Sequence, residues 1–146
     1  MAPRRDEGPA GIPTTAPLPS DVAVRFEGVS RSYGRGDGQV TAVDRVDLDI
    51  PRGSIFGVIG HSGAGKSTLI RLVNALEAPS AGRVIVDGVD LAALGTSQLR
   101  DARKQTAMIF QQFQLLETVT VLDNVAMPLR LDGVSRSVAR ARATEA

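Results

Sequence analysis

The sequence predicts an α/β fold with an added antiparallel β edge. Two segments near the start, 22–30 and 40–50, alternate apolar and polar residues as half-buried strands do. A short apolar run, 55–60, then leads through a glycine-rich loop into a segment with helical periodicity, 66–77. Antiparallel strands followed by a strand–loop–helix unit and a second apolar run, 106–110, are typical of an α/β domain with a β edge.

The first 20 residues differ in composition from the rest of the chain. They contain five of the eight prolines and almost no large apolar side chains. Such a segment cannot bury enough apolar surface to offset the entropy lost on ordering. We therefore expect residues 1–20 to be a disordered Pro/Ala-rich tail and residues 21–146 to form the domain.

The remaining elements follow from turn residues and from the spacing of apolar side chains. Pro and Gly supply the restricted and permissive backbone dihedrals of turns, and Asp-Gly is a strong hairpin signal. The helix over 66–77 is expected to bury its apolar side. The predicted elements are a loop over 31–39, a turn at 51–54, a buried parallel strand at 55–60, a hairpin over 82–91 turning at Asp87-Gly88, a polar helix at 97–105, a buried strand at 106–110, and helices at 118–131 and 137–146.

Composition excludes several kinds of site and partner. With 17 basic and 16 acidic residues the net charge is +1, which gives no general attraction to nucleic acid or to an anionic membrane. The chain has no cysteine, so disulfides and thiolate metal sites are excluded. Its apolar runs are too short to cross a bilayer. A cytoplasmic setting is the expectation.

A glycine-rich loop is the strongest functional signal. Gly60, Gly65, Lys66 and Ser67 match G-x-x-x-x-G-K-[ST] between a predicted strand and a predicted helix. Glycines allow the backbone N–H groups to face a phosphate at the positive end of the helix dipole. Lys66 is expected to reach the β- and γ-phosphates, and the Ser67 hydroxyl to coordinate Mg²⁺. The predicted nucleotide contacts of the loop are Gly60, His61, Ser62, Gly63, Ala64, Gly65, Lys66, Ser67 and Thr68.

The competing interpretation is a glycine-rich turn before an ordinary helix. Lys66 is one of only two lysines in the chain, which makes a chance match to the pattern rare. The expected strand before the loop and the helix after it are also the context that the motif requires. Both observations favour a nucleotide site.

Four further residues have more than one interpretation. Tyr33, the only tyrosine, either stacks on a purine or anchors a loop at the surface. His61 occupies a variable position of the loop, so a catalytic role is not expected. Asp87 follows an apolar run, but its Asp-Gly pair favours a hairpin turn over a metal ligand. Gln111 follows a predicted strand, at the sheet edge where α/β folds bind ligands.

Four segments together resemble the nucleotide-binding subunit of ABC transporters. They are GHSGAGKST (60–68), GRVIVDG (82–88), MIFQQFQLL (108–116) and TVLDNV (120–125), and the resemblance covers roughly residues 21–146. It implies a P-loop NTPase core that binds ATP and Mg²⁺. It also implies that Tyr33 stacks on adenine, and that Gln111 is the Q-loop glutamine. By the same resemblance, Gln111 is expected to sense the γ-phosphate and to be a ligand of Mg²⁺. Gln111 and Lys66 are the expected catalytic residues.

The resemblance is strongest to methionine-importer ATPases. Asn74 and the Leu76-Glu77 pair after the loop helix fit that group, whereas Gln112-Phe113-Gln114 stands where many members have His-Phe-Asn. This resemblance implies an ATP-binding subunit that couples ATP binding and hydrolysis to the import of an amino acid, methionine. The implied partners are a second ATP-binding subunit in a homodimer and membrane permease subunits, with no nucleic acid. The implied location is the cytoplasmic face of the membrane.

Other parts of the ABC catalytic machinery do not occur in the 146 residues. These are the LSGGQ-type signature, an apolar strand ending in Asp-Glu, and a switch histidine. We therefore expect the chain to be the N-terminal part of an ABC ATP-binding domain, truncated within the helical subdomain, and unable to hydrolyse ATP alone. Two alternatives remain open: an ATPase of the cell-division or lipoprotein-release type, and a nucleotide-binding module without catalysis.

Overall fold

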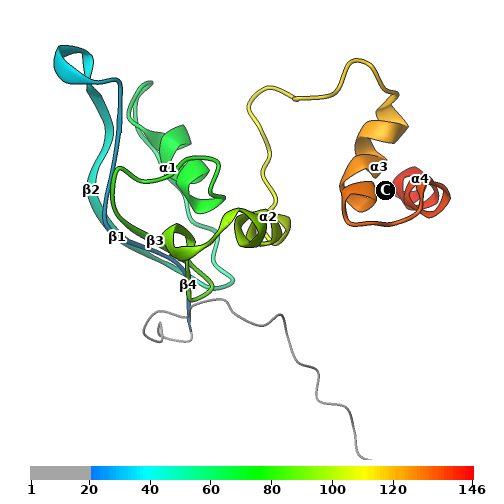
Figure 1. The fold of residues 1–146 in the computed structure, drawn as a ribbon, viewed down its shortest axis with the longest axis horizontal. Helices are drawn as coiled ribbons and strands as arrows, with labels where there is room; N and C mark the ends of the chain where they lie inside the picture. The colour runs from blue at the N-terminus through cyan, green and yellow to red at the C-terminus, as the bar shows by residue number, and fades with distance from the viewer. Residues whose placement is uncertain (1–20) are drawn as a thin grey trace, which may run out of the picture. The chain divides into compact units, whose positions relative to one another are not determined.

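The computed structural model describes residues 21–146, so the predicted tail over 1–20 lies outside the described residues. The described residues divide into two compact units, 21–107 and 108–146. The first unit contains a sheet with two α-helices, and the second contains a pair of helices (Figure 1).

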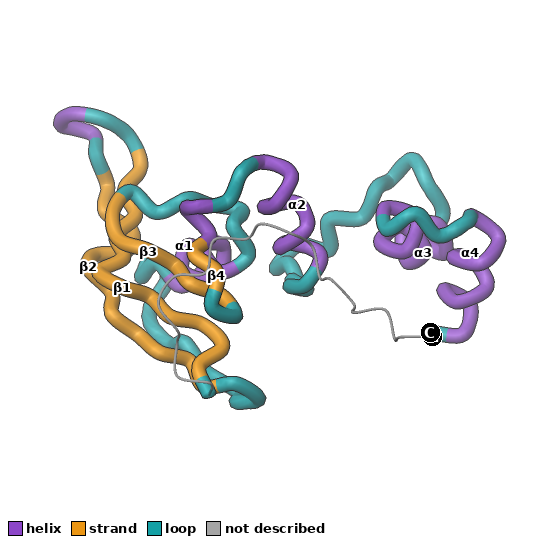
Figure 2. Tube along the Cα trace, turned by 60° about the horizontal axis from the view of Figure 1, so that its bottom comes forward, coloured by secondary structure: helices purple, strands orange, loops and turns teal. Residues whose placement is uncertain are grey.

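The sheet of the first unit is antiparallel throughout. Its strands are β1 (Val22–Tyr33), β2 (Val40–Pro51), β3 (Ala81–Val86) and β4 (Val89–Asp90), in the order β2-β1-β3-β4 (Figure 2). The long strands β1 and β2 contain the two alternating segments of the sequence. The predicted antiparallel edge is therefore confirmed.

The core of this unit lies between the sheet and two helices. Phe26, Val29 and Val84 of the sheet are almost completely buried. Leu72 of α1 (Lys66–Val73) joins the same cluster, and Leu99 of α2 (Thr96–Lys104) packs against it. Burial of these side chains fixes α1 on the sheet, and with it the glycine-rich loop that precedes α1.

The hairpin between β3 and β4 turns where the sequence predicts. Asp87 and Gly88 both have positive φ, +50° and +80°, as the two central residues of a type I′ turn require. Asp87 Oδ1 also accepts a hydrogen bond from a guanidinium nitrogen of Arg52 at 2.6 Å. A short 3₁₀ turn (Leu91–Ala93) follows, with Asp90 as its N-cap. Asp87 is therefore a turn residue.

The two predicted buried strands at 55–60 and 106–110 are wrong. Neither segment is a strand, and Ile55, Ile59 and Ile109 are fully exposed. A parallel strand needs a hydrogen-bonded neighbour and cover on both faces. Among the described residues no strand pairs with either run, so an apolar run alone does not form one.

Two boundaries near α1 and β1 also differ from the prediction. The helix expected over 66–77 ends at Val73, because Asn74 Oδ1 accepts a hydrogen bond from Leu76 N at 3.1 Å and Ala75 has a φ of +55°. The loop expected over 31–39 begins later, because β1 continues to Tyr33 opposite Val40. A 3₁₀ turn (Gly36–Gly38) then joins the strands.

The second unit consists of α3 (Val121–Leu131) and α4 (Arg136–Glu145). Helix α3 begins three residues later than predicted, because Thr120 caps it by accepting a hydrogen bond from Asp123 N. The buried Asp123 carboxylate accepts a hydrogen bond from Arg140 of α4 at 3.0 Å, which ties the two helices together. No helix within residues 21–146 is long and apolar enough to span a membrane.

Candidate functional site

The glycine-rich loop closes against the sheet at Gly65. This residue is the N-cap of α1 and has a φ of +84°. A Cβ at this position would lie 2.0 Å from the carbonyl oxygen of Ala42 on β2. Both the dihedral and the close backbone approach therefore require glycine, which explains the second glycine of the motif.

The side chain of Lys66 folds back over the loop. Its Nζ donates hydrogen bonds to the carbonyl oxygens of Gly60 at 2.7 Å and His61 at 2.6 Å. Ala64 N also donates to the His61 oxygen, at 3.3 Å, which closes a turn inside the loop. A single positive charge is thus held among backbone groups at the start of α1.

The first turn of α1 presents unused backbone donors. No side chain caps this helix, and the first helical hydrogen bond to a loop residue runs from Leu69 N to Gly65 O at 2.9 Å. The N–H groups of Lys66, Ser67 and Thr68 lie ahead of that bond, where a helix has no acceptor of its own. Free N–H groups, a lysine and the helix dipole together suit a phosphate group.

The residues present also fit a magnesium ion beside such a phosphate. Ser67 is exposed at the beginning of α1. Its hydroxyl is a hard oxygen donor, and Mg²⁺ takes few protein ligands, completing its shell with phosphate oxygens and water. Within residues 21–146 no group of three or more His, Cys, Asp or Glu side chains forms a separate metal site.

Tyr33 lies next to the helix that carries the loop. Its hydroxyl is 3.4 Å from Oγ1 of Thr68, although the two residues are 35 positions apart in the sequence. The guanidinium carbon of Arg31 lies 4.7 Å from the centre of the tyrosine ring. The structure therefore brings Tyr33 and the loop helix together, as the nucleotide-site hypothesis needs.

Arg31 and Glu77 lie near the site, and the sequence interpretation did not predict either of them as a site residue. An amino group of Arg31 donates to Glu77 Oε2 at 2.7 Å, and both side chains are largely buried. Alternation along β1 was a usable signal for Arg31, because residues two apart on a strand share a face. Glu77 had no such signal, since it lies 46 positions away from Arg31.

His61 and Gln111 complete the predicted set. His61 is exposed, and its Nδ1 lies 2.7 Å from the Ser62 carbonyl oxygen, a contact within the loop. Gln111 belongs to the second unit, where it is exposed in the segment before α3. The roles of both residues stay predictions.

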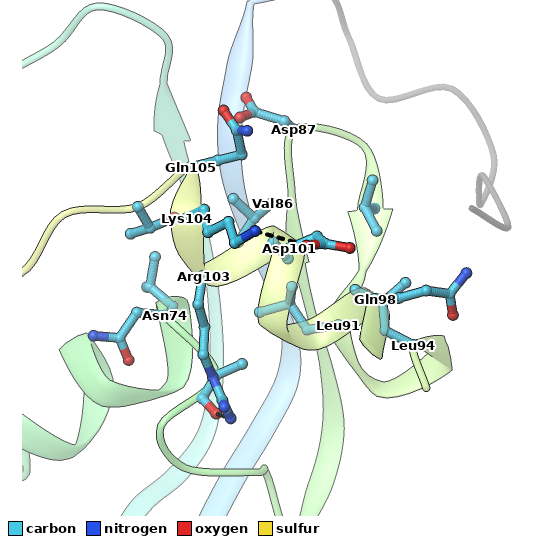
Figure 3. Close-up of a pocket in the computed structure, with 15 residues that line it drawn as sticks. Asn74, Val86, Asp87, Leu91, Leu94, Gln98, Asp101, Arg103, Lys104 and Gln105 are labelled. Carbon is cyan, nitrogen blue, oxygen red and sulfur yellow. Dashed lines mark hydrogen bonds and ion pairs between the residues drawn. The ribbon is translucent and has the colours of Figure 1, made fainter. Parts of the chain in front are cut away.

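One hollow of the first unit lies away from the loop. A cavity of about 610 Å³ lies between the end of α1, the β3–β4 hairpin and α2 (Figure 3). Its apolar floor includes Leu91 and Leu94, and on its rim Lys104 forms an ion pair with Asp101 at 3.3 Å. No residue of 60–68 lines it. The candidate phosphate site is therefore separate from this cavity.

The chain is similar to known proteins over most of its length. The family model described as "ABC transporter" matches residues 43–146. Methionine import ATP-binding protein MetN of Chromohalobacter salexigens is 58% identical over 119 residues, which are 82% of this chain and 34% of that protein. MetN 2 of Rhodococcus jostii is 56% identical over 122 residues, 84% of this chain and 36% of that protein. The chain thus spans about a third of the length of these relatives.

A solved structure has the same fold over most of the chain. The ATP-binding cassette MJ0796, determined as a dimer in a post-hydrolysis state bound to ADP and phosphate, superposes with a TM-score of 0.77 and 32% identity. The match covers 84% of this chain and 54% of the cassette. The α/β class with an antiparallel edge is confirmed at the level of the whole fold, even though the runs at 55–60 and 106–110 are not strands in this chain.

Proposed function

Because the chain belongs to the ABC transporter family, we propose that it forms the ATP-binding subunit of an importer whose substrate is methionine. The observation that carries the ATP-binding part is the loop at the start of α1, where Lys66 Nζ lies on the carbonyls of Gly60 and His61 beside uncapped N–H groups. The relatives named for methionine import support the choice of substrate.

Each predicted site residue has a role in this proposal. Lys66 and the loop N–H groups hold the β- and γ-phosphates, and Tyr33 stacks on the adenine. Oxygens of Ser67 and Gln111 would hold Mg²⁺, which would neutralise phosphate charge. Gln111 and Lys66 act as the catalytic residues of this part of the protein. On binding ATP, the Lys66 ammonium exchanges two backbone carbonyls for phosphate oxygens, which are stronger partners.

The partners proposed are a second ATP-binding subunit and a membrane permease. The dimeric state of the cassette MJ0796 supports the first, and the import function in the names of the relatives supports the second. The segment after Gln111 is the part proposed to contact the permease. The subunit then lies at the cytoplasmic face of the membrane, held there by the permease.

Replacing Lys66 tests the nucleotide site. Lys66→Ala removes charge-assisted hydrogen bonds to phosphate, so we expect Kd for Mg-ATP to rise by about 10- to 100-fold. The measurement is a titration with a fluorescent ATP analogue. The matched control is Lys104→Ala, the only other lysine, which lies on α2 away from the loop. Equal affinities for the Lys66→Ala and wild-type chains would contradict the proposal.

The transported substrate needs a cellular test. A strain in which the gene is deleted is expected to lose uptake of radiolabelled methionine and to regain it with the wild-type gene, but not with Lys66→Ala. Unchanged methionine uptake in the deletion strain, with loss of uptake of another amino acid, would correct the substrate and leave the ATP site intact.

A further inference from the structure

We propose that Arg31 is a positioning residue that sets the Tyr33 ring for stacking on the adenine base. The inference rests on the proposed function, because it needs an adenine nucleotide at the loop. Arg31 and Tyr33 are two residues apart near the end of β1, and the guanidinium carbon lies 4.7 Å from the ring centre. That separation is within the range of a cation–π contact.

Arg31 is itself fixed from the opposite side by Glu77. Their ion pair is 2.7 Å long, and the two side chains are only 25% and 21% exposed. Glu77 N donates to the Arg71 carbonyl oxygen at 3.1 Å, so the backbone at Glu77 is attached to α1. Through Glu77, the guanidinium is held by the segment that ends the loop helix.

Tyr33 is meanwhile attached to the beginning of the same helix. Its hydroxyl lies 3.4 Å from Oγ1 of Thr68, in the first turn of α1. Arg31 and Tyr33 therefore join the end of β1 to both ends of α1, the helix whose N-terminus presents the phosphate-binding groups. This arrangement sets where the ring lies relative to the phosphate site.

The contact with Arg31 also decides which face of the ring is available. An aromatic ring has two faces, and the guanidinium covers one of them. A base can stack only on the other. The cation on the covered face holds the ring in place, so less side-chain freedom is lost when the base binds.

One further observation marks Arg31 as more than a surface ion pair. Its Nε is buried and has no hydrogen-bond partner among the described residues. A buried donor without a partner costs folding free energy. Lysine at this position avoids that cost and keeps the charge, but it lacks the planar group that stacks on a ring. The arginine is therefore explained by its contact with Tyr33.

The test compares a ligand that has adenosine on its three phosphates with one that has the three phosphates alone. Titrations of the purified chain use Mg-ATP and Mg-tripolyphosphate. For Arg31→Ala we expect Kd for Mg-ATP to rise about fivefold, the size of an ordinary cation–π contribution, while Kd for tripolyphosphate stays unchanged. Tyr33→Ala is expected to show the same selectivity, and the double variant to lose little more than either single variant.

Arg25→Ala is the matched control. Arg25 lies on the same strand, has a similar exposed fraction of 24%, and forms its own ion pair with Asp49, but it does not contact Tyr33. It is expected to change neither Kd. Arg31→Lys keeps the positive charge without the planar group. It is expected to bind Mg-ATP more weakly and tripolyphosphate as tightly as the wild type does, and it tests the proposal even if the alanine variant does not fold.

Tyrosine fluorescence gives a readout that a merely structural role does not move. Tyr33 is the only tyrosine and the chain has no tryptophan, so its emission reports on this ring alone. Arg31→Lys is expected to alter the emission of the free chain and to weaken its quenching by Mg-ATP. Unchanged quenching, or an equal loss of affinity for both ligands, would overturn the role of Arg31. An unaffected Kd in Lys66→Ala would instead overturn the nucleotide site itself.

Discussion

Gly63 and Gly65 share a backbone conformation but differ in their surroundings. Both have positive φ, +81° and +84°. A Cβ at Gly63 meets nothing within 4 Å, whereas a Cβ at Gly65 meets the Ala42 carbonyl oxygen at 2.0 Å. The first glycine is required only by its dihedral angle, and the second also by the sheet behind it. The motif in the sequence does not distinguish the two.

This difference predicts unequal losses of folding stability. Gly63→Ala is expected to lower the free energy of unfolding by about 1 kcal/mol, the cost of a left-handed alanine. Gly65→Ala adds a clash with backbone that cannot move aside, so its loss is expected to exceed about 3 kcal/mol. Urea unfolding followed by circular dichroism measures both. Equal losses for the two variants would show that the loop does not rest on β2.

At the level of the elements, β1 and β2 are joined by a bidentate ion pair as well as by their backbones. Arg25 and Asp49 face each other in the register, and Arg25 donates to both carboxylate oxygens, at 2.6 and 2.7 Å. The hydrogen bond from Arg25 holds the pKa of Asp49 below its ordinary value. The Asp49 side chain is 46% exposed, so the contribution of the pair to stability is sensitive to salt.

The lowered pKa of Asp49 predicts a pH dependence of stability. The pKa of Asp49 is lower in the folded chain than in the unfolded chain. The contribution of its carboxylate to the free energy of unfolding is therefore complete above the unfolded pKa and is lost as pH falls through the folded pKa. In the wild type, the urea concentration at the unfolding midpoint is expected to fall on acidification, in part because this contribution is lost. Asp49→Asn is expected to lack that part of the fall. Asp44→Asn is the control, because the Asp44 carboxylate forms an ion pair with its sequence neighbour Arg45 at 3.3 Å. Parallel pH profiles for the wild type and Asp49→Asn would contradict the prediction.

Elements with local signals were predicted better than those that need a distant partner. The hairpin at Asp87-Gly88 formed as expected, because its turn depends on the dihedrals of two adjacent residues. The runs at 55–60 and 106–110 carry no local signal that separates a strand from an extended segment. Their conformation depends on a neighbouring strand, and none pairs with them among the described residues.

Over the whole molecule, apolar side chains divide into a small core and an exposed set. Phe26 and Leu72 are buried in the first unit, while Ile55 and Ile59 of the same unit are fully exposed. Exposed apolar side chains contribute nothing to burial, and a contiguous group of them promotes association. The number of apolar residues in the sequence therefore overestimates how much apolar burial stabilises the fold.

Replacing the exposed isoleucines tests this division. The double variant Ile55→Thr/Ile59→Thr is expected to change the free energy of unfolding of the 146-residue chain by less than about 0.5 kcal/mol. It is also expected to lower the fluorescence of a bound hydrophobic dye. Leu72→Ala, in the core, is the contrasting control with an expected loss of about 2–5 kcal/mol. A loss of that size in the threonine variant would place residues 55–60 in a packed environment.

Features that depend on a few adjacent residues followed from the sequence alone. These are the alternation of the long strands, the hairpin turn, the existence of the helices, and the glycines, lysine and serine of the loop. The folded chain was needed to show that the loop closes against Ala42, that Tyr33 lies beside Thr68, and that Arg31 pairs with Glu77. The physical reason is separation along the chain. Dihedral preference and periodicity act locally, whereas contacts between residues 35 and 46 positions apart exist only once the core has packed.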